Sequence, residues 1–518
     1  MKNKMLHACT AFFLCLLPLS AQDEEPQLPP QHNFTIIQGE HNHDLNPQTA
    51  SYSSEAQILT SLYEGLFSYN PETLAPLPAI AESYRISRNK RRWTFILRSN
   101  IKFSDGTPIT AEDVRASWLS LLSTKNALYA SLFDIVTGAK EFRTGNAAED
   151  TVGIFAKDEK TLVVQLNTPA AHFSRLLCHH AFSVINKDLS VASGAYYLAE
   201  RDSSHMILKK NEYYWDKDSV HIPQITINLS DNDENNTFDF NDGNADWIDS
   251  AFTVNKLLNQ NAVQLNAEFG TQYLFFKAAN SPWNNADFRM ALLTAVPWEK
   301  LRKDYLIKAD TFIYPLAGYP AVNGFSYTDS DEALELMKEA RKKANIPEDK
   351  SLKLVFSVMD SPYSLKQAEL LKSSWEVLGV DLVIQPVAPE KYLTSIQGSN
   401  ADLFSYSWIG DFSDPLTFLE LFRGGSTLNM AEYKNEKYDS LLDAAAADNS
   451  DNHFKLLSEA EQLLLDDGMI LPVSHPVSLN AIDLQSVGGW TANSLDVHPF
   501  KYLYFKSNPL KLENIVMK

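Results

Sequence analysis

Residues 352–384, LKLVFSVMDSPYSLKQAELLKSSWEVLGVDLVI, indicate the fold class most directly. Apolar side chains alternate over 352–358, as they do in a half-buried strand. Residues 364–378 have helical spacing, Gly379 is placed to end the helix, and 380–384 form a second strand. A strand, a helix of this length and another strand make a βαβ unit, which predicts parallel pairing with a right-handed crossover. The chain is therefore predicted to be an α/β protein.

The rest of the chain also mixes strands and helices. Short alternating runs predict strands at 34–37, 93–97, 162–166 and 400–408. Amphipathic spacing predicts helices at 56–67, 111–123, 436–448 and 452–466. Thr110 precedes the second of these helices, and Asp113 lies three residues after Thr110, an arrangement that approximates a capping box.

The N-terminus indicates export. A basic start is followed by the apolar run 11–19 and by small residues ending at Ala21, which predicts a signal peptide over 1–21. The run is too short to span a membrane. Residues 22–32, rich in Pro, Gln and acids, are predicted to be a disordered leader. We expect a free periplasmic protein, with lipid attachment at Cys9 or Cys15 as an alternative.

Size and charge limit the function. About 500 residues remain after cleavage, which is too many for one core, so at least two compact units with a ligand between them are expected. The net charge of -20 argues against nucleic-acid binding, because no basic stripe is available to contact phosphates. Cys178 is the only cysteine beyond the signal peptide, so no internal disulfide is expected.

Motifs for catalysis are missing. There is no nucleophile elbow, phosphate-binding loop, His-Glu-x-x-His sequence or cysteine pair. Residues 41–44 and 178–180 contain histidines but not the further ligands of a closed metal site. We therefore predict a protein that is not an enzyme and has no metal or cofactor. An exported hydrolase and a folding chaperone are the alternatives from other classes.

Residues 404–425, FSYSWIGDFSDPLTFLELFRGG, contain two acids with different interpretations. Asp414 precedes Pro415 and a helical pattern, as a helix N-cap does. Asp411 has no such structural role and lies near Trp408, where a desolvated carboxylate needs a cationic partner. The amino terminus of a peptide would supply that cation.

The chain resembles the oligopeptide- and dipeptide-binding family of ABC-transporter solute receptors. The resemblance is strongest in AESYRISRNKRRWTFILRSNIKFSDGTPITAEDVRASW, residues 81–118, and it covers nearly the whole mature chain. It implies a large, two-lobed periplasmic-binding-protein-like fold of the cluster C type with a hinge. Lobe one would comprise 33–270, including an extra subdomain at about 64–183. Lobe two would comprise 271–489, and 490–518 would return to lobe one.

The resemblance also implies a site and partners. Short peptides would bind between the lobes as an extended strand, which gives affinity through the main chain. The implied ligand-binding residues are Asp411, Trp408, Tyr406, Ser407, Ser51, Tyr52, Ser53, Tyr129 and Trp490. Ser405 stands where relatives often have an arginine for the ligand's carboxyl end, and Ile409 stands where some have a disulfide cysteine.

The implied protein is a monomeric receptor for an ABC permease and its ATPase subunits. A metal chelate, haem or sugar is the alternative ligand, because one fold can serve several ligand classes.

Overall fold

The computed structural model describes residues 33–506 except 51, 250, 449 and 451. The predicted signal peptide and leader lie outside these residues. No helix in the described part of the chain is long and apolar enough to cross a bilayer.

The first sheet has seven strands in the order β12-β19-β11-β1-β10-β9-β8. The strands are β1 (Phe34–Gln38), β8 (Tyr196–Arg201), β9 (His205–Lys210), β10 (Gln224–Leu229), β11 (Trp247–Ile248), β12 (Val263–Ala267) and β19 (Val477–Ile482). The predicted strand at 34–37 is thus the central β1, parallel to both neighbours. Helix α1 (Ser53–Leu62) contacts β8, and helix α5 (Asp233–Asn241) contacts β11.

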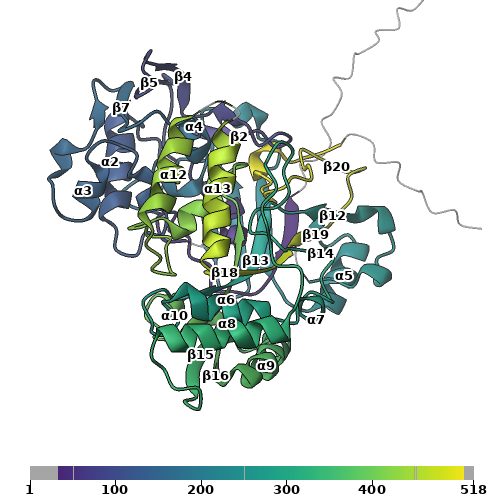
Figure 1. Cartoon of the computed structure of the whole chain (residues 1–518). Coiled ribbons are helices and arrows are strands. Elements are labelled where there is room, and N and C mark those ends of the chain that lie inside the picture. Colours follow the sequence, from purple (N-terminus) through teal and green to yellow (C-terminus); the bar gives the residue numbers. More distant parts are fainter. Residues whose placement is uncertain (1–32, 51, 250, 449, 451, 507–518) are drawn as a thin grey trace, which may run out of the picture. The chain divides into compact units, whose positions relative to one another are not determined.

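The second sheet has six strands in the order β14-β18-β13-β17-β15-β16. The strands are β13 (Gly270–Phe276), β14 (Ile307–Lys308), β15 (Leu352–Met359), β16 (Val380–Val387), β17 (Leu403–Ile409) and β18 (Ile470–His475). Its helices are α6 (Ala286–Thr294), α7 (Trp298–Leu301), α8 (Ser330–Lys343), α9 (Pro362–Trp375), α10 (Pro389–Ile396), α11 (Leu416–Leu419), α12 (Glu436–Ala447) and α13 (Asn452–Asp466). Figure 1 shows α8, α9 and α10 gathered around β15 and β16.

The predicted βαβ unit is confirmed. β15 and β16 are parallel, and α9 connects them. Ser361 caps α9 by accepting a hydrogen bond from the Ser364 amide, and Pro362 occupies the first turn, where its missing N–H costs nothing. Gly379 has a φ of 71°, which a residue without Cβ adopts freely at a helix end.

A smaller four-stranded sheet, β4-β5-β7-β6, lies within the range predicted for the extra subdomain. It consists of β4 (Ala81–Ile86), β5 (Arg92–Leu97), β6 (Ile154–Ala156) and β7 (Thr161–Gln165), with the helices α2 (Ala111–Ser123), α3 (Ala139–Arg143) and α4 (Phe173–Leu176) nearby. The predicted capping box of α2 is present at Thr110 and Asp113. One buried apolar cluster extends from this region to the six-stranded sheet and includes Trp118, Phe133 and Tyr273. Two short ribbons complete the strands: β2 (Phe67–Tyr69) with β3 (Pro76–Pro78), and β20 (Val487–Gly488) with β21 (Tyr504–Phe505).

Several predicted boundaries differ from the structure, and two of these differences affect how the chain is organised. The helix predicted at 56–67 ends at Leu62, and Tyr63 is already extended. Gly65 then lies so close to the Leu177 carbonyl that a Cβ would be 2.7 Å from its oxygen. The return to the first sheet was expected at residue 490, but the strand pairing places it at Val477, because β19 pairs with β11 and β12.

Candidate functional site

A cavity of about 530 Å³ lies between segments of the first sheet, the extra region and the second sheet. The second sheet contributes the end of β15, the start of α9, part of α10 and residues 405–411. The opposite wall contains Tyr52, Ala56, Thr60, Tyr69, Tyr129, His179, His180, Leu495 and Val497. Its size suits a small organic ligand rather than a protein domain.

Most of the predicted site residues meet in this cavity. Six of the nine line it: Asp411, Trp408, Tyr406, Ser407, Tyr52 and Tyr129. Ser51 lies outside the described residues, and Ser53 forms the first residue of α1.

Trp490 is placed elsewhere. Its ring stacks on His498 at 4.2 Å and meets Trp247 edge-on, within the apolar cluster of the first sheet. It therefore packs in a core and is not part of the cavity wall.

Asp411 is held firmly at the cavity wall. The Thr417 hydroxyl donates a hydrogen bond of 3.0 Å to Oδ2 of Asp411 and accepts one from the Asp411 amide. The Tyr69 hydroxyl donates to the Asp411 carbonyl at 2.8 Å. Gly410 allows this placement, because a Cβ there would lie 2.8 Å from the Phe269 ring and 2.9 Å from Thr417.

The other carboxylate oxygen of Asp411 faces His179. Oδ1 lies 3.5 Å from Nε2 of His179, and both side chains are buried. Nδ1 of His179 accepts a hydrogen bond from the Ala181 amide, so the proton of the neutral ring is on Nε2 and points toward Asp411. The contact is longer than a normal hydrogen bond and leaves Oδ1 free to take a stronger donor.

Burial governs the electrostatics of this pair. Desolvation raises the pKa of Asp411 from 3.8 to about 7, against the lowering effect of Thr417. Burial and the neighbouring His180 hold the pKa of His179 well below 6.5. Among the described lining residues there is no lysine or arginine. The cavity thus presents a carboxyl group whose charged form needs an external cation.

Next to Asp411, β17 offers a partly open edge. The strand pairs with β13 along its whole length but with β15 only at Leu403 and Phe404. The Asp402 carbonyl accepts a hydrogen bond from the Lys277 amide, and the Gly410 amide donates one to the Phe269 carbonyl. Both residues therefore direct these groups toward the β13 side. Antiparallel pairing alternates, so the odd-numbered residues between them direct their N–H and C=O groups to the other edge.

Asp414, predicted to be a helix N-cap, lies one residue before Pro415, which is the N-cap of α11, and it has an additional partner. Oδ1 of Asp414 accepts from the Leu416 amide at 3.0 Å, which is a capping contact. Oδ2 lies 2.9 Å from Nε2 of His453 at the start of α13, and Nδ1 of His453 contacts the Ala445 carbonyl at 2.7 Å. A ring with both nitrogens facing acceptors is best satisfied as the cation.

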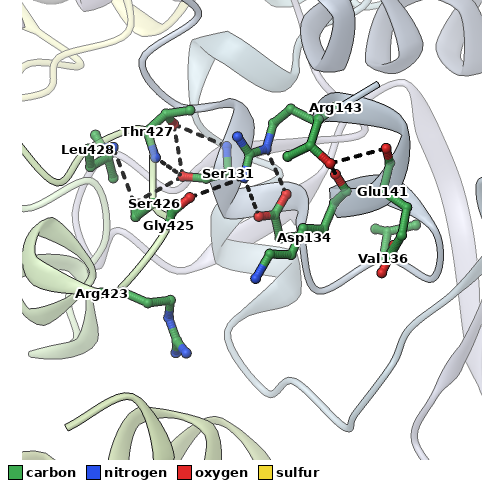
Figure 2. Close-up of polar contacts among 12 residues, drawn as sticks. Ser131, Asp134, Val136, Glu141, Arg143, Arg423, Gly425, Ser426, Thr427 and Leu428 are labelled. Carbon is green, nitrogen blue, oxygen red and sulfur yellow. Dashed lines mark hydrogen bonds and ion pairs between the residues drawn. The ribbon is translucent and has the colours of Figure 1, made fainter. Parts of the chain in front are cut away.

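A cluster of hydroxyl groups joins the extra region to the segment after α11 (Figure 2). We call it the hydroxyl clasp; it consists of Ser131, Ser426 and Thr427. Thr427 donates to the Leu128 carbonyl at 2.6 Å, and its amide donates to Oγ of Ser131 at 3.0 Å. Arg143, paired with Asp134, adds a contact of 3.3 Å to the Gly425 carbonyl.

Other chemistry is not evident in the described residues. No group of three or more His, Cys, Asp or Glu side chains in them is arranged to hold a metal ion. Burial raises the pKa of the Cys178 thiol far above its usual range, so it is not a nucleophile at neutral pH.

Residues 75–430 match the family described as bacterial extracellular solute-binding proteins, family 5. The chain belongs to this family. The chain is similar to the dipeptide-binding protein DppE of Bacillus subtilis (26% identical; 87% of each chain covered) and to the periplasmic murein peptide-binding protein MppA of Escherichia coli (28%; 91% of this chain and 94% of MppA). The probable deoxycholate-binding periplasmic protein YgiS of E. coli is 27% identical, with 95% of this chain and 97% of YgiS covered.

The fold is that of a two-lobed family-5 receptor. A solved structure of MppA, 26% identical, superimposes with a TM-score of 0.81 over 93% of this chain and all of MppA. The unliganded open form of MppA gives a TM-score of 0.64 over 92% of this chain and 98% of MppA. This chain therefore resembles the first of these MppA structures more closely than it resembles the unliganded open form.

Several contributors to the site were not predicted, among them His179, Thr417 and Tyr392. His179 lies in the segment 178–180, which was considered only as a possible metal site and lacks the further ligands that such a site needs. Thr417 follows Asp411 by six residues on a short helix, where sequence gives no sign of contact. Tyr392 comes from α10, outside any motif that we recognised.

Proposed function

We propose that this chain is the substrate-binding component of a peptide ABC importer. It captures short peptides as an extended strand in the cavity and delivers them to a membrane permease driven by ATPase subunits. The observation that carries the proposal is the position of Asp411, a buried carboxyl at the end of the open edge of β17.

The chemistry of Asp411 favours an amine. A buried carboxylate is costly without a cation, and the nearby His179 is held neutral by its own burial. The ammonium group of a peptide would lie beside Oδ1, form charge-assisted hydrogen bonds and relieve this cost. The names of DppE and MppA, which state dipeptide and murein peptide binding, support the same ligand class.

The main chain supplies the rest of the affinity. An extended peptide running from Asp411 along β17 would add a strand to the sheet, and such hydrogen bonding does not depend on side chains. The wall opposite contains the tyrosines Tyr52, Tyr69 and Tyr129, and Trp408 lines the cavity from β17 itself. Aromatic side chains of this kind contact many different ligand groups, so we expect broad specificity.

The protein acts as a monomeric receptor outside the cytoplasm, without catalysing a reaction. Relatives such as MppA are named as periplasmic, which fits the predicted signal peptide. Closure of the two lobes around the ligand would convert a transient encounter into a captured state that the permease recognises.

Native mass spectrometry of the mature protein, purified without refolding, tests the proposal. We expect co-purified peptides of two to several residues, which are lost in Asp411→Asn. Asp249→Asn is the matched control, because desolvation also raises the pKa of the half-buried Asp249 to about 7, but Asp249 does not line the cavity. A bile acid, haem, sugar or metal chelate would refute the proposed ligand, whereas peptides retained by Asp411→Asn would refute Asp411 as the anchor.

A further inference from the structure

The open edge of β17 has a defined end. β15 leaves β17 after Phe404, so Ser405 is the first residue with outward main-chain groups that no strand pairs. The gap between the two strands at this point contains a side chain from α10. This side chain is Tyr392, which is 2% exposed and also lines the cavity.

The hydroxyl of Tyr392 contacts both the amide and the carbonyl of Ser405, which point to the open edge of β17. The Ser405 amide donates to it at 2.9 Å, and it lies 2.8 Å from the Ser405 carbonyl, to which it can donate. It also lies 3.0 Å from the Ser357 carbonyl on β15. One hydroxyl thus bridges the two strands where they separate, and the phenol ring fills the space that a further strand residue would need.

Beyond Ser405 the edge is open toward the cavity. The alternation of the β13 pairing directs the outward groups of Ser407 and Ile409 to the same side as those of Ser405. Ser407 is exposed, and both residues line the cavity. The usable edge therefore runs from Asp411 to Ser407 and stops at Tyr392.

We propose that the Tyr392 side chain sets the length of ligand that this receptor accepts in its main-chain groove. The inference rests on the proposed function, since it assumes a peptide strand with its amino end at Asp411. Such a strand pairs with Ile409 and Ser407 and then meets the phenol. Residues of the ligand beyond this point must turn out of the groove and gain no further strand hydrogen bonds.

This role differs from anchoring. Tyr392 does not contact the ligand's amino end, and the proposal does not require it to raise affinity for short peptides. It excludes a third pair of hydrogen bonds at Ser405. Outward pairs on a strand repeat every two residues, so removing the block should extend the groove by two ligand residues.

The test is an alanine peptide series from two to eight residues, with dissociation constants measured by calorimetry for the wild type and three variants. Tyr392→Ala and Tyr392→Ser remove the ring and open the edge. Tyr392→Phe keeps the ring and removes only the hydroxyl. We expect affinity to stop rising at the same length for the wild type and Tyr392→Phe, and at a length two residues longer for Tyr392→Ala and Tyr392→Ser.

Tyr196→Phe is the control for loss of a buried hydroxyl, because Tyr196 donates to the Ile222 carbonyl away from the cavity. It should leave the length profile unchanged. A uniform change across all lengths in Tyr392→Ala and Tyr392→Ser would show a structural role only and overturn the inference. If the wild type binds no peptide of any length, the proposed function itself fails, which is a different result.

Amide exchange of the wild type gives a second readout that needs no variant. Peptide binding should slow exchange at Ser407 and Ile409, whereas Ser405 should exchange slowly with and without ligand. If a long peptide newly protects Ser405, Tyr392 does not end the groove.

Discussion

Nε2 of His179 lies 3.5 Å from Oδ1 of Asp411, and burial disfavours the charged form of both groups. Burial raises the pKa of Asp411 to about 7, while the pKa of His179 stays well below 6.5. At physiological pH the Asp411 carboxyl is therefore close to its pKa, and the neighbouring imidazole of His179 is neutral. Ligand binding should be linked to the proton on Asp411.

Peptide affinity should be greatest between about pH 7 and 8. Below pH 7 Asp411 must lose a proton to receive an ammonium, so affinity falls by about tenfold per pH unit. Above about pH 8 the free peptide loses its own charge, because an α-amino group has a pKa of about 7.7–8.0. Calorimetry from pH 5 to 9 measures this profile.

Asp411→Asn is the control for that profile. We expect it to bind about 100-fold or more weakly at pH 7.5, because a charged hydrogen-bonding partner is lost, and to lose the decline below pH 7. A decline of equal slope in the variant would show that another group is responsible.

Binding affinity should depend much more on the charge at the amino end of a peptide than on the charge at its carboxyl end. N-acetylation removes the ammonium and should weaken binding by about 100-fold. Amidation of the carboxyl end should change affinity by less than about threefold, because no lysine or arginine is among the described residues that line the cavity. Competition with acid and amide forms of one tripeptide distinguishes the two effects. A loss above tenfold on amidation would reveal a cationic partner for the carboxylate.

Lys501 should be important for stability. Its Nζ lies 2.7 Å from Oε1 of the buried Glu64; Oε1 also accepts a hydrogen bond from the Tyr214 hydroxyl, and Oε2 accepts one from Nε1 of Trp215. Lys501→Met leaves the carboxylate without its cation and should lower the free energy of unfolding by about 3–5 kcal/mol. Denaturant melts measure this loss.

Lys256→Met is the comparison for that experiment. Lys256 pairs with Glu234 at the surface, where both side chains are more than half exposed, so its loss should cost less than about 1 kcal/mol. Equal losses in the two variants would contradict a buried ion pair at Glu64.

The pair of Asp414 and His453 should give a stability that depends on pH. The hydrogen bond to Asp414 raises the pKa of His453; burial would raise the pKa of Asp414, but His453 lowers it. The contribution of His453 is thus complete below about pH 6.5 and disappears as pH rises through its raised pKa. That of Asp414 is complete above about pH 4 and disappears as pH falls through its lowered pKa.

His453→Gln tests this window. We expect it to cost about 1.5–3 kcal/mol at pH 5.5 and clearly less at pH 9, as measured by urea unfolding. His205→Gln is the control, since His205 is half-buried and its partner Asp202 is exposed. A cost for His453→Gln that is independent of pH would show that the ring acts as a neutral donor.

The sequence predicted local structure best where one residue type has one physical role. Gly379 ends a helix because it adopts a positive φ, and Thr110 begins one because its hydroxyl meets an orphan amide. Asp411 was identified for the opposite reason, since no local role explained it. Its lining of the cavity agrees with that interpretation.

What could not be predicted depends on contacts between distant segments. Tyr392 and Ser405 meet only because α10 lies over the point where β15 and β17 separate. Trp490 and Tyr129 are both buried aromatic residues, and only the packing places Tyr129 at the cavity wall and Trp490 away from it. The early return at Val477 is similar, because β18 and β19 are adjacent in sequence but belong to different sheets.

The hydroxyl clasp of Ser131, Ser426 and Thr427 connects its two segments through neutral groups. Dissolved salt screens interactions between exposed charges but has little effect on hydrogen bonds between hydroxyls. A receptor that works outside the cytoplasm meets whatever ionic strength surrounds the cell. The strength of this connection should therefore stay nearly constant from dilute to saline surroundings.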